Sequence, residues 1–487
     1  MKLDFSFAEE LTALGSEVKP IKLINSRLDV FNHSLATELN LPSEWQHESH
    51  LFKAMYTENG TLNRHSMAQK YGGHQFGHWN PELGDGRGLL LAEVIDSNAQ
   101  PHDLHLKGAG PTPYSRHADG RAVLRSTLRE YIGAEAQHYL GIPSSRSLCL
   151  FTSEDTVYRE RPETGAMMIR TAPSHIRFGH FEYYFYASQK DKLQRLLDFT
   201  IEHHFAECKA ATNPYAALLG AVVTRTARLV ALWQTHGFVH GVMNTDNMSI
   251  HGITFDYGPF AFLDNYEPGA VFNHSDHQGR YAFNQQPGIA LWNLNALAHA
   301  FSGHCSVDEI KAALSTFEPT FISQYQHLML SRMGIETNEK EQSLAVMQSW
   351  LQILETKNLD YTYCFRQLAL ADINKAQCPF HDIFVSQENR FKQVTLVDQE
   401  KADAWWESYR KLRLAREEET ELLSLNPAVI PRTHLLQQAI ELAEKGDFSL
   451  SDSLLEATST PYDARWDTHP FSKPPSSSTN TSLSCSS

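Results

Sequence analysis

The chain has 487 residues, of which 41% are hydrophobic and 20% charged, a composition typical of a soluble globular protein. Its formal net charge of −15 argues against a nucleic-acid or acidic-membrane partner, since both are negatively charged. The six cysteines form no CxxC pair, so reduced thiols are expected rather than a disulfide framework. The N-terminus has no apolar signal segment, and no apolar run approaches a membrane span. We therefore expect a cytoplasmic monomer.

Residues 1–70 predict an N-terminal extension of one or two helices and loops. Residues 71–185 predict a small mixed lobe with one long helix, for which Asp119 is a plausible N-cap. The expected elements of that lobe are strands at 89–95, 103–107, 147–152, 156–159 and 166–171 and a helix at 121–140.

Residues 186–471 predict a mainly helical lobe, because apolar residues recur at helical spacing. Its expected helices are 190–204, 215–237, 286–301, 306–317, 339–354, 398–419 and 433–445. Residues 472–487 are rich in Ser, Thr and Pro and predict a flexible tail that carries Cys485.

A glycine-rich loop, LGDGRG, precedes the first strand of the small lobe. Gly84 and Gly86 would let backbone N–H groups approach phosphate oxygens, and Arg87 could bind a phosphate with its forked donors. An ordinary glycine turn in a hairpin is the alternative, and the loop alone does not decide between the two.

Lys107 ends the second strand, and Glu130 lies in the middle of the following helix. A strand lysine that binds phosphates needs a carboxylate to hold its ammonium in place, and a helix glutamate supplies one in protein kinases. Glu135 is the second choice for this partner. The alternative is a surface lysine and a solvated glutamate, but the order of loop, strand, strand with Lys and helix with Glu matches the small lobe of a kinase.

Asp119 and Gly120 precede the long helix, while Arg170 follows an apolar strand and Arg177 lies in the next loop. If the two arginines converge with the glycine loop, they form an unusually cationic phosphate pocket for an acidic protein. Scattered surface salt bridges are an equally good interpretation of the sequence alone.

The stretch HGVMNTDNMSIHGITFDYGPF, residues 240–260, holds the candidate catalytic groups. Asn247 lies seven residues after a histidine, and Asp256 opens an Asp-Tyr-Gly triplet, as in the metal-binding loops of kinases. Residues 250–255 would form a turn and strand, so that a hairpin brings these two oxygen ligands together on Mg²⁺. Val242 occupies the position of the kinase base. Asp246 is the candidate proton acceptor, or alternatively a group that orients the metal site.

Two groups of histidines have the spacing of metal ligands: His74 with His78, and His274 with His277. No HExxH helix or matched cysteine set accompanies them, so structural histidines are expected. A zinc hydrolase built on them is nevertheless a third functional alternative.

Four segments resemble the selenoprotein O family of protein adenylyltransferases, which are pseudokinases. They are YGGHQFGHWNPELGDGRG, KGAGPTPYSRHADGRAVLRSTLREY, HGVMNTDNMSIHGITFDYGPF and NHSDHQGRYAFNQQPGIALWNLNALA. The resemblance runs from about residue 30 to the C-terminus. It implies an α+β, protein-kinase-like fold with a mixed N-lobe and a mainly helical C-lobe, and an inverted nucleotide. It also implies AMP transfer from ATP to Ser, Thr or Tyr hydroxyls of proteins with release of pyrophosphate, and UMP transfer from UTP in the bacterial branch.

The resemblance also implies roles for single residues. Asn247 and Asp256 would bind Mg²⁺ or Mn²⁺, and Asp246 would accept the proton. Cys485 is third from the C-terminus, where many eukaryotic members carry selenocysteine, and a redox role is implied; Phe272 replaces the cysteine that could pair with it in some bacterial members. The residues implied to contact ATP are Gly84, Gly86, Arg87, Lys107, Asp119, Gly120, Arg170, Arg177 and Asp256.

Two other functions remain open on the residues themselves. An ordinary protein kinase would transfer the γ-phosphate, and a pseudokinase scaffold would bind nucleotide without transferring any part of it. The intact Asn247 and Asp256 count against the scaffold, and the valine at the kinase base position counts against the kinase.

Overall fold

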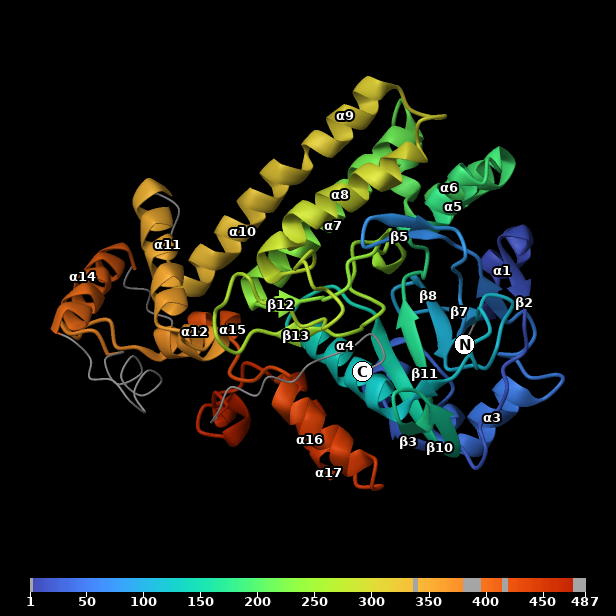
Figure 1. Cartoon of the computed structure of the whole chain (residues 1–487), viewed down its shortest axis with the longest axis horizontal. Coiled ribbons are helices and arrows are strands. Elements are labelled where there is room, and N and C mark those ends of the chain that lie inside the picture. Colours follow the sequence, from blue (N-terminus) through green and yellow to red (C-terminus); the bar gives the residue numbers. More distant parts are fainter. Residues whose placement is uncertain (1–2, 336–339, 380–395, 414–418, 476–487) are drawn as a thin grey trace.

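An antiparallel sheet forms the centre of the N-lobe in the computed structural model, which describes residues 3–335, 340–379, 396–413 and 419–475 (Figure 1). The strand order is β2-β4-β7-β8-β11-β10-β3, with β1 paired to β7 and β9 paired to β11. The strands are β1 (Leu3–Asp4), β2 (Gly15–Glu17), β3 (Arg27–Phe31), β4 (Met67–Gln69), β7 (Gly88–Ile95), β8 (Pro101–Lys107), β9 (Ala122–Val123), β10 (Arg146–Tyr158) and β11 (Pro162–Ala172). β7, β8, β10 and β11 occupy the regions where the sequence predicted strands.

The first seventy residues contribute to this sheet as strands, whereas the sequence predicted only helices and loops there. Besides β1–β4 they form α1 (Ser6–Glu10), α2 (His33–Glu38) and α3 (Glu48–Tyr56). Side chains of α2 and α3 share one hydrophobic cluster with Leu104 and Leu106 of β8. On the opposite face of the sheet, α4 (Leu124–Tyr139) shares a cluster with Leu90 and Met168. The N-terminal segment therefore covers one face of the sheet and α4 covers the other.

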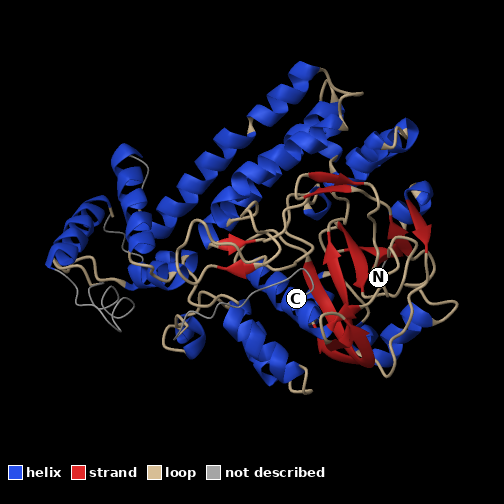
Figure 2. Cartoon of the chain, viewed as in Figure 1, coloured by secondary structure: helices blue, strands red, loops and turns tan. Residues whose placement is uncertain are grey.

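The C-lobe consists mainly of helices, as predicted (Figure 2). The described ones are α5 (Phe178–Tyr186), α6 (Lys190–His204), α7 (Pro214–His236), α8 (Gln286–His299), α9 (Val307–Ser315), α10 (Phe317–Met333), α11 (Lys340–Thr356), α12 (Tyr361–Leu370), α14 (Leu396–Leu412), α15 (Glu419–Leu425), α16 (Thr433–Ala443) and α17 (Ser449–Ser459). Short strands also form β5 (Gly73–Gln75) with β6 (His78–Asn80), and β12 (Phe238–Val239) with β13 (Ala261–Phe262).

α7 is the central helix of the C-lobe. The Asn213 side chain caps its N-terminus, Pro214 occupies the first turn, and Gly237 ends it with φ +69°. By length and composition α7 could cross a membrane, which corrects the expectation that no apolar run is long enough. Its side chains instead contribute to the main hydrophobic cluster, as in the core helix of a soluble protein. α7 leads directly into the loop that carries Asp246.

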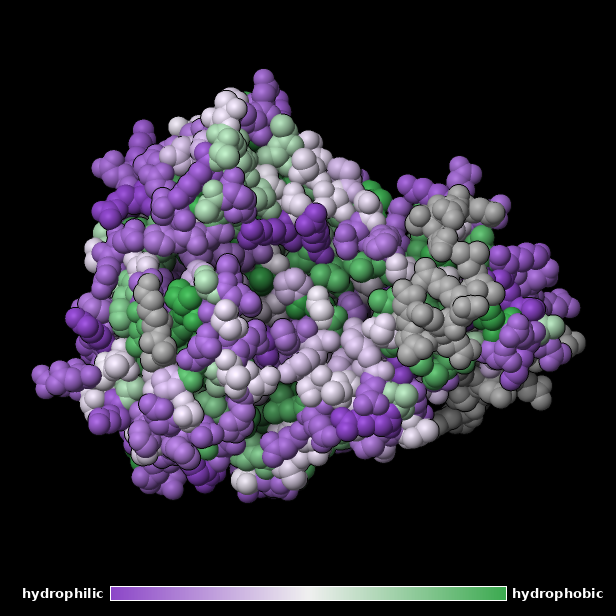
Figure 3. Space-filling model, turned by 180° about the vertical axis from the view of Figure 1, so that it is seen from behind, coloured by the Kyte–Doolittle hydropathy of each residue, from purple (hydrophilic) through white to green (hydrophobic). Residues whose placement is uncertain are grey.

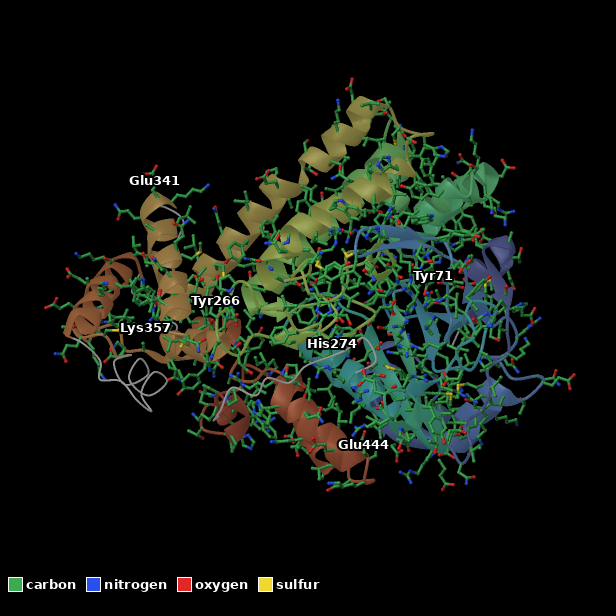
Figure 4. The ribbon with its side chains drawn as sticks, in the orientation of Figure 1. Tyr71, Tyr266, His274, Glu341, Lys357 and Glu444 are labelled. Atoms are coloured by element: carbon green, nitrogen blue, oxygen red, sulfur yellow. The ribbon has the colours of Figure 1, made fainter. Side chains whose placement is uncertain are left out.

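The space-filling view from behind shows mostly hydrophilic side chains, with hydrophobic residues in scattered patches (Figure 3). Glu341 and Lys357, at the two ends of α11, lie on the far side of the molecule from Tyr71 of the N-lobe (Figure 4). The C-lobe helices thus extend well away from the sheet, and the candidate site lies at the sheet end of the lobe.

Candidate active site

Lys107, at the end of β8, forms a buried ion pair with Glu130 of α4. Arg170 of β11 joins the same carboxylate, with 3.1 Å between its Nη1 and Glu130 Oε1. Burial lowers the pKa of Lys107, while the charge of Glu130 opposes that shift. Glu135, the second choice for this pairing, instead binds Arg146, with Arg146 Nη2 at 2.8 Å from Glu135 Oε2. The structure therefore places the strand lysine and the mid-helix glutamate together.

Asp256 connects this cluster to the C-lobe. Arg170 Nη1 lies 2.5 Å from Asp256 Oδ1, and Arg177 pairs with the other carboxylate oxygen. Burial alone would raise the pKa of Asp256, but the two arginines hold it well below its ordinary value. Asp256 has φ +57°, a left-handed conformation that is uncommon outside glycine and occurs mostly at constrained positions. Glu130, Arg170, Asp256 and Arg177 thus form a continuous chain of charges between the lobes.

Arg87 is the cation of the cluster that has no ionic partner. Its charge interacts most strongly with Glu130 and Asp256, yet within the described part of the chain its guanidinium forms no hydrogen bond or ion pair. Burial lowers the pKa of Arg87, and the positive charge of Arg170 acts in the same direction. A partly buried guanidinium with free donors beside other cations is a site that favours a polyanion.

The loop after α7 holds Asp246 and Asn247 in a short 3₁₀ turn, Thr245–Asn247. Arg177 Nη1 donates to the backbone oxygen of Asp246 at 2.8 Å, which ties this loop to Asp256. The Asp246 side chain is buried, and burial raises its pKa to about 7 although Arg177 opposes the shift. Asn247 Nδ2 donates to the backbone oxygen of Val242 at 3.0 Å, which leaves the Asn247 amide oxygen available as a ligand.

The hairpin predicted for residues 250–255 is absent from the structure. The segment makes only one isolated bridge, Thr254 to Ser144, and the residue before it, Ser249, makes another to Arg177. Both bridges lead out of the loop to neighbouring segments, because β10, β11 and α5 position those partners nearby. Asn247 and Asp256 therefore occupy one long loop, which is closed at its base by the antiparallel pairing of β12 with β13 and held further along by contacts with residues before α7.

Comparisons with known proteins show the family of the chain. A family model described as "Protein adenylyltransferase SelO" matches residues 2–459. This chain belongs to the SelO family. The protein nucleotidyltransferase YdiU of Pseudoalteromonas atlantica is 46% identical over 493 residues, covering 100% of both chains. The protein of the same name from Vibrio parahaemolyticus is 45% identical, covering 99% of this chain and 98% of its own.

A solved structure, ROP2 from Toxoplasma gondii, is described as a virulence factor with a protein-kinase fold and no enzymatic activity. It is 13% identical and aligns with 56% of this chain and 81% of its own, with a TM-score of 0.25, an overlap too small to support an argument.

The glycines of this SelO-family chain permit close packing. Gly84 has φ +145°, and a Cβ there would lie 2.7 Å from the Tyr114 ring. A Cβ at Gly86 would lie 2.9 Å from the Tyr114 backbone oxygen. Gly120 has φ +65° and touches the backbone of Gly110. Because these residues have no side chain, the glycine-rich loop can pack against the segment 110–120. Packing alone therefore requires glycine here, whether or not the loop also binds a phosphate.

Asp119 lies at the edge of the site and does not cap α4, which corrects the prediction. It is exposed and pairs with Arg159, whose Nη1 lies 2.8 Å from Asp119 Oδ2. The short strand β9 intervenes, so α4 begins at Leu124 with Val123 at its N-cap. The positive charge of Arg159 acts to lower the pKa of Arg87, so the arginine that Asp119 binds lies near the cationic cluster.

The candidate metal-binding histidines of the SelO-family chain lie in different surroundings. His74 Nδ1 lies 3.1 Å from Glu182 Oε2, and its ring contacts Trp79 and Trp292. His78, His274 and His277 are exposed. Within the described residues no group of three or more His, Cys, Asp or Glu side chains could hold a metal ion.

The cysteines supply no redox centre within the described ranges. Cys149, Cys208, Cys305 and Cys364 are buried free thiols, and Cys378 is also buried. Phe272 is half-buried against the second hydrophobic cluster of the C-lobe. Cys485 lies outside the described residues, so its expected role stays a prediction.

Sequence reasoning missed the contact of the β5–β6 hairpin with the Asp246 loop. Gln75 Nε2 lies 3.3 Å from Asp246 Oδ2, and a Cβ at Gly73 would lie 2.5 Å from Asp246 Oδ1. A cavity of about 610 Å³ opens at the tip of this hairpin, lined by Phe76, His78 and residues of the segment 275–289. The signal in the sequence was the glycine pair before His74, which marks a close backbone approach.

Proposed function

We propose that this SelO-family chain is a metal-dependent protein adenylyltransferase that moves AMP from ATP to hydroxyl groups of proteins. The observation that carries the proposal is the deep cationic cluster. Arg87, Lys107, Arg170 and Arg177 surround the carboxylates of Glu130 and Asp256, and among the described residues Arg87 has no hydrogen-bond or ion-pair partner. A triphosphate supplies the missing negative charge.

The chemistry follows from which end of the triphosphate lies deep in the site. With the β- and γ-phosphates bound by the basic side chains, they become the leaving group, and the α-phosphate faces the Asp246 loop. The acceptor hydroxyl oxygen attacks the α-phosphorus, the bond from that phosphorus to the bridging oxygen breaks, and pyrophosphate departs. Asp246 accepts the hydroxyl proton. The basic side chains neutralise the charge that develops on the leaving pyrophosphate.

The donor atoms of Asn247 and Asp256 fit Mg²⁺ or Mn²⁺, because an amide oxygen and a carboxylate are hard ligands and such ions share their other positions with phosphates and water. The Asn247 amide is oriented for this purpose, since its nitrogen is occupied by the Val242 backbone oxygen. When bound, the ion neutralises phosphate charge. Asp256 is held by Arg170 and Arg177, so a metal ion at its carboxylate shares it with them or displaces one.

The nearest alternative, γ-phosphoryl transfer, has less support. Val242 stands where a kinase has its base, and its side chain is apolar and buried. UMP transfer from UTP is part of our proposal, because the basic residues named above would contact only phosphates, which both nucleotides share.

Labelled nucleotides test the proposal. Incubation with α-³²P-ATP and Mn²⁺ or Mg²⁺ should label protein, and γ-³²P-ATP should not. Intact-mass spectrometry should then find an AMP adduct, and Asp256→Ala should abolish it. Label from the γ position alone would show a kinase, and label from neither position, with ATP still bound, would show a scaffold.

A further inference from the structure

Consecutive residues of the β5–β6 hairpin donate hydrogen bonds to the loop that carries Asp246 and to its neighbour Tyr281. The His74 backbone N–H donates to Thr245 Oγ1 at 2.7 Å. Gln75 Nε2 donates to Asp246 Oδ2 at 3.3 Å. The Phe76 N–H donates to Asn244 Oδ1 at 3.2 Å and to the Tyr281 hydroxyl at 3.0 Å. Three consecutive residues of the hairpin thus bind three consecutive residues of the loop, an arrangement that fixes the position of the loop.

The orientation of the Gln75 amide follows from the backbone N–H of Glu82, which can donate a hydrogen bond but cannot accept one. The backbone N–H of Glu82 donates to Asn80 Oδ1 at 2.9 Å, which turns Asn80 Nδ2 toward Gln75. Asn80 Nδ2 then donates to Gln75 Oε1 at 3.1 Å. Because the oxygen of Gln75 is occupied in this way, its nitrogen faces Asp246. A backbone N–H has one polarity, so the chain of amides has one consistent assignment.

The Asp246 carboxylate has few other contacts that could orient it. Within the described residues Gln75 supplies its one hydrogen bond from another side chain, and Oδ1 is buried without a partner. Gly73 borders Oδ1 so closely that a Cβ there would lie 2.5 Å from it. Asp246 is therefore confined on one side by a glycine and oriented on the other by an amide.

We propose that Gln75 is a positioning residue, which holds the Asp246 carboxylate in the orientation from which it accepts the proton of the incoming hydroxyl. Asn80 supports it by fixing the amide. The inference rests on the proposed role of Asp246, but it concerns the hairpin, whose residues lie about 170 positions away in the sequence. Gln75 acts on Asp246 and not on the nucleotide, so it should affect turnover and leave the affinity for ATP unchanged.

Single substitutions test this inference through kcat and the KM for ATP, measured by label transfer from α-³²P-ATP. Gln75→Ala should lower kcat by about tenfold to a hundredfold, because a misplaced catalytic group costs about that much, with KM changed less than about twofold. Gln75→Glu preserves size, but its carboxylate cannot donate and repels that of Asp246, so above neutral pH it should lower kcat at least as much. Gln46→Ala, at an exposed glutamine outside the site and the cavity, is the matched control and should behave as wild type.

A double-mutant cycle separates positioning from general packing. Asn80→Ala should lower kcat less than Gln75→Ala, and the double variant should be no worse than Gln75→Ala, because Asn80 acts only through the Gln75 amide. Equal melting temperatures would exclude loss of fold. Wild-type kcat in both Gln75 variants, or a change confined to KM, would overturn the inference. Asp246→Asn tests the underlying role separately, because wild-type turnover in that variant would instead refute the proposed function.

Discussion

At the scale of single residues, Arg87 is the group whose removal reports most directly on nucleotide binding. Its guanidinium has no partner within the described residues, so Arg87→Ala should leave stability nearly unchanged. A hydrogen bond to a charged group contributes about 1.5–3 kcal/mol, which corresponds to a loss of roughly tenfold to a hundredfold in kcat/KM for ATP. Arg64→Ala, an exposed arginine far from the cluster in sequence, serves as the control. Unchanged kcat/KM in Arg87→Ala would contradict the phosphate assignment.

Glu130 and Glu135 lie on the same helix and are both buried with arginines, so they form a matched pair. Glu130→Gln leaves the buried Lys107 without its counter-charge, and Glu135→Gln leaves Arg146 only the more exposed Glu38, so we expect losses of unfolding free energy of up to about 3–5 kcal/mol. Only Glu130→Gln should also weaken ATP binding, since only Glu130 holds Lys107. Urea denaturation and equilibrium nucleotide binding measure the two effects. Equal weakening of binding in both variants would show that the effect is not specific to the site.

The sequence was informative about the candidate site where a residue and its partner lie on strongly patterned elements. Lys107 ends an alternating strand and Glu130 lies within a periodic helix, and the structure brings them together. The sequence could not predict a residue's partner where that partner is set by contacts between segments far apart in the chain. Asp119 has the residue type of an N-cap but binds Arg159, because β9 separates it from the helix. The contact between Gln75 and Asp246 joins residues too distant in the sequence for any local pattern to indicate.

At the scale of elements, β7 and β8 place two carboxylates opposite each other, Glu93 and Asp103, and both are buried. Burial raises the pKa of Glu93 from 4.5 to about 7, although the Phe7 N–H that it accepts opposes the shift. Burial and the charge of Glu93 raise the pKa of Asp103 well above its ordinary value. The unfolded chain loses the Glu93 proton near pH 4.5 while the folded chain keeps it to about pH 7, so this group lowers stability as the pH rises through that window.

Glu93→Gln should therefore be more stable than wild type at pH 8, because an amide needs no ionisation and still accepts the Phe7 N–H. A pKa difference of one corresponds to about 1.4 kcal/mol, so the gain should be on the order of 3 kcal/mol. It should disappear near pH 4, where both states of wild type are protonated. Melting temperatures across that range measure it, and a difference that does not vary with pH would contradict the assignment.

The elements that were missed have physical reasons in common. α5, FGHFEYYFY, carries aromatic residues on most of its surface and is largely buried, so it lacks the polar face that marks an amphipathic helix. β1 and β2 have only two and three residues and are formed by pairing with β7 and β4, not by their own pattern. α4, α6 and α7 were predictable because each is long and has an apolar face that packs on a single core.

At the scale of the whole molecule, the N-terminal seventy residues are needed for the sheet. Leu35, Leu51 and Phe52 cover one of its faces and are buried. A chain that begins at Tyr71 would expose that face and lose four strands, and we expect it to be insoluble or to lack cooperative unfolding. Soluble yield and a thermal unfolding curve, compared with the full chain, measure this. Cooperative melting at the wild-type temperature would show that the segment is dispensable.

The attachment of the β5–β6 hairpin to the Asp246 loop has a mechanical consequence. A two-lobed enzyme that admits its nucleotide by hinge motion needs a seam along which the lobes can separate. Here that seam is crossed by the bonds of His74, Gln75 and Phe76, and by the arginines that join β11 and α5 to Asp256. Opening along it would break all of them together. Separating the lobes there is therefore opposed by several hydrogen bonds and ion pairs at once, and the proton acceptor stays in place as long as they hold.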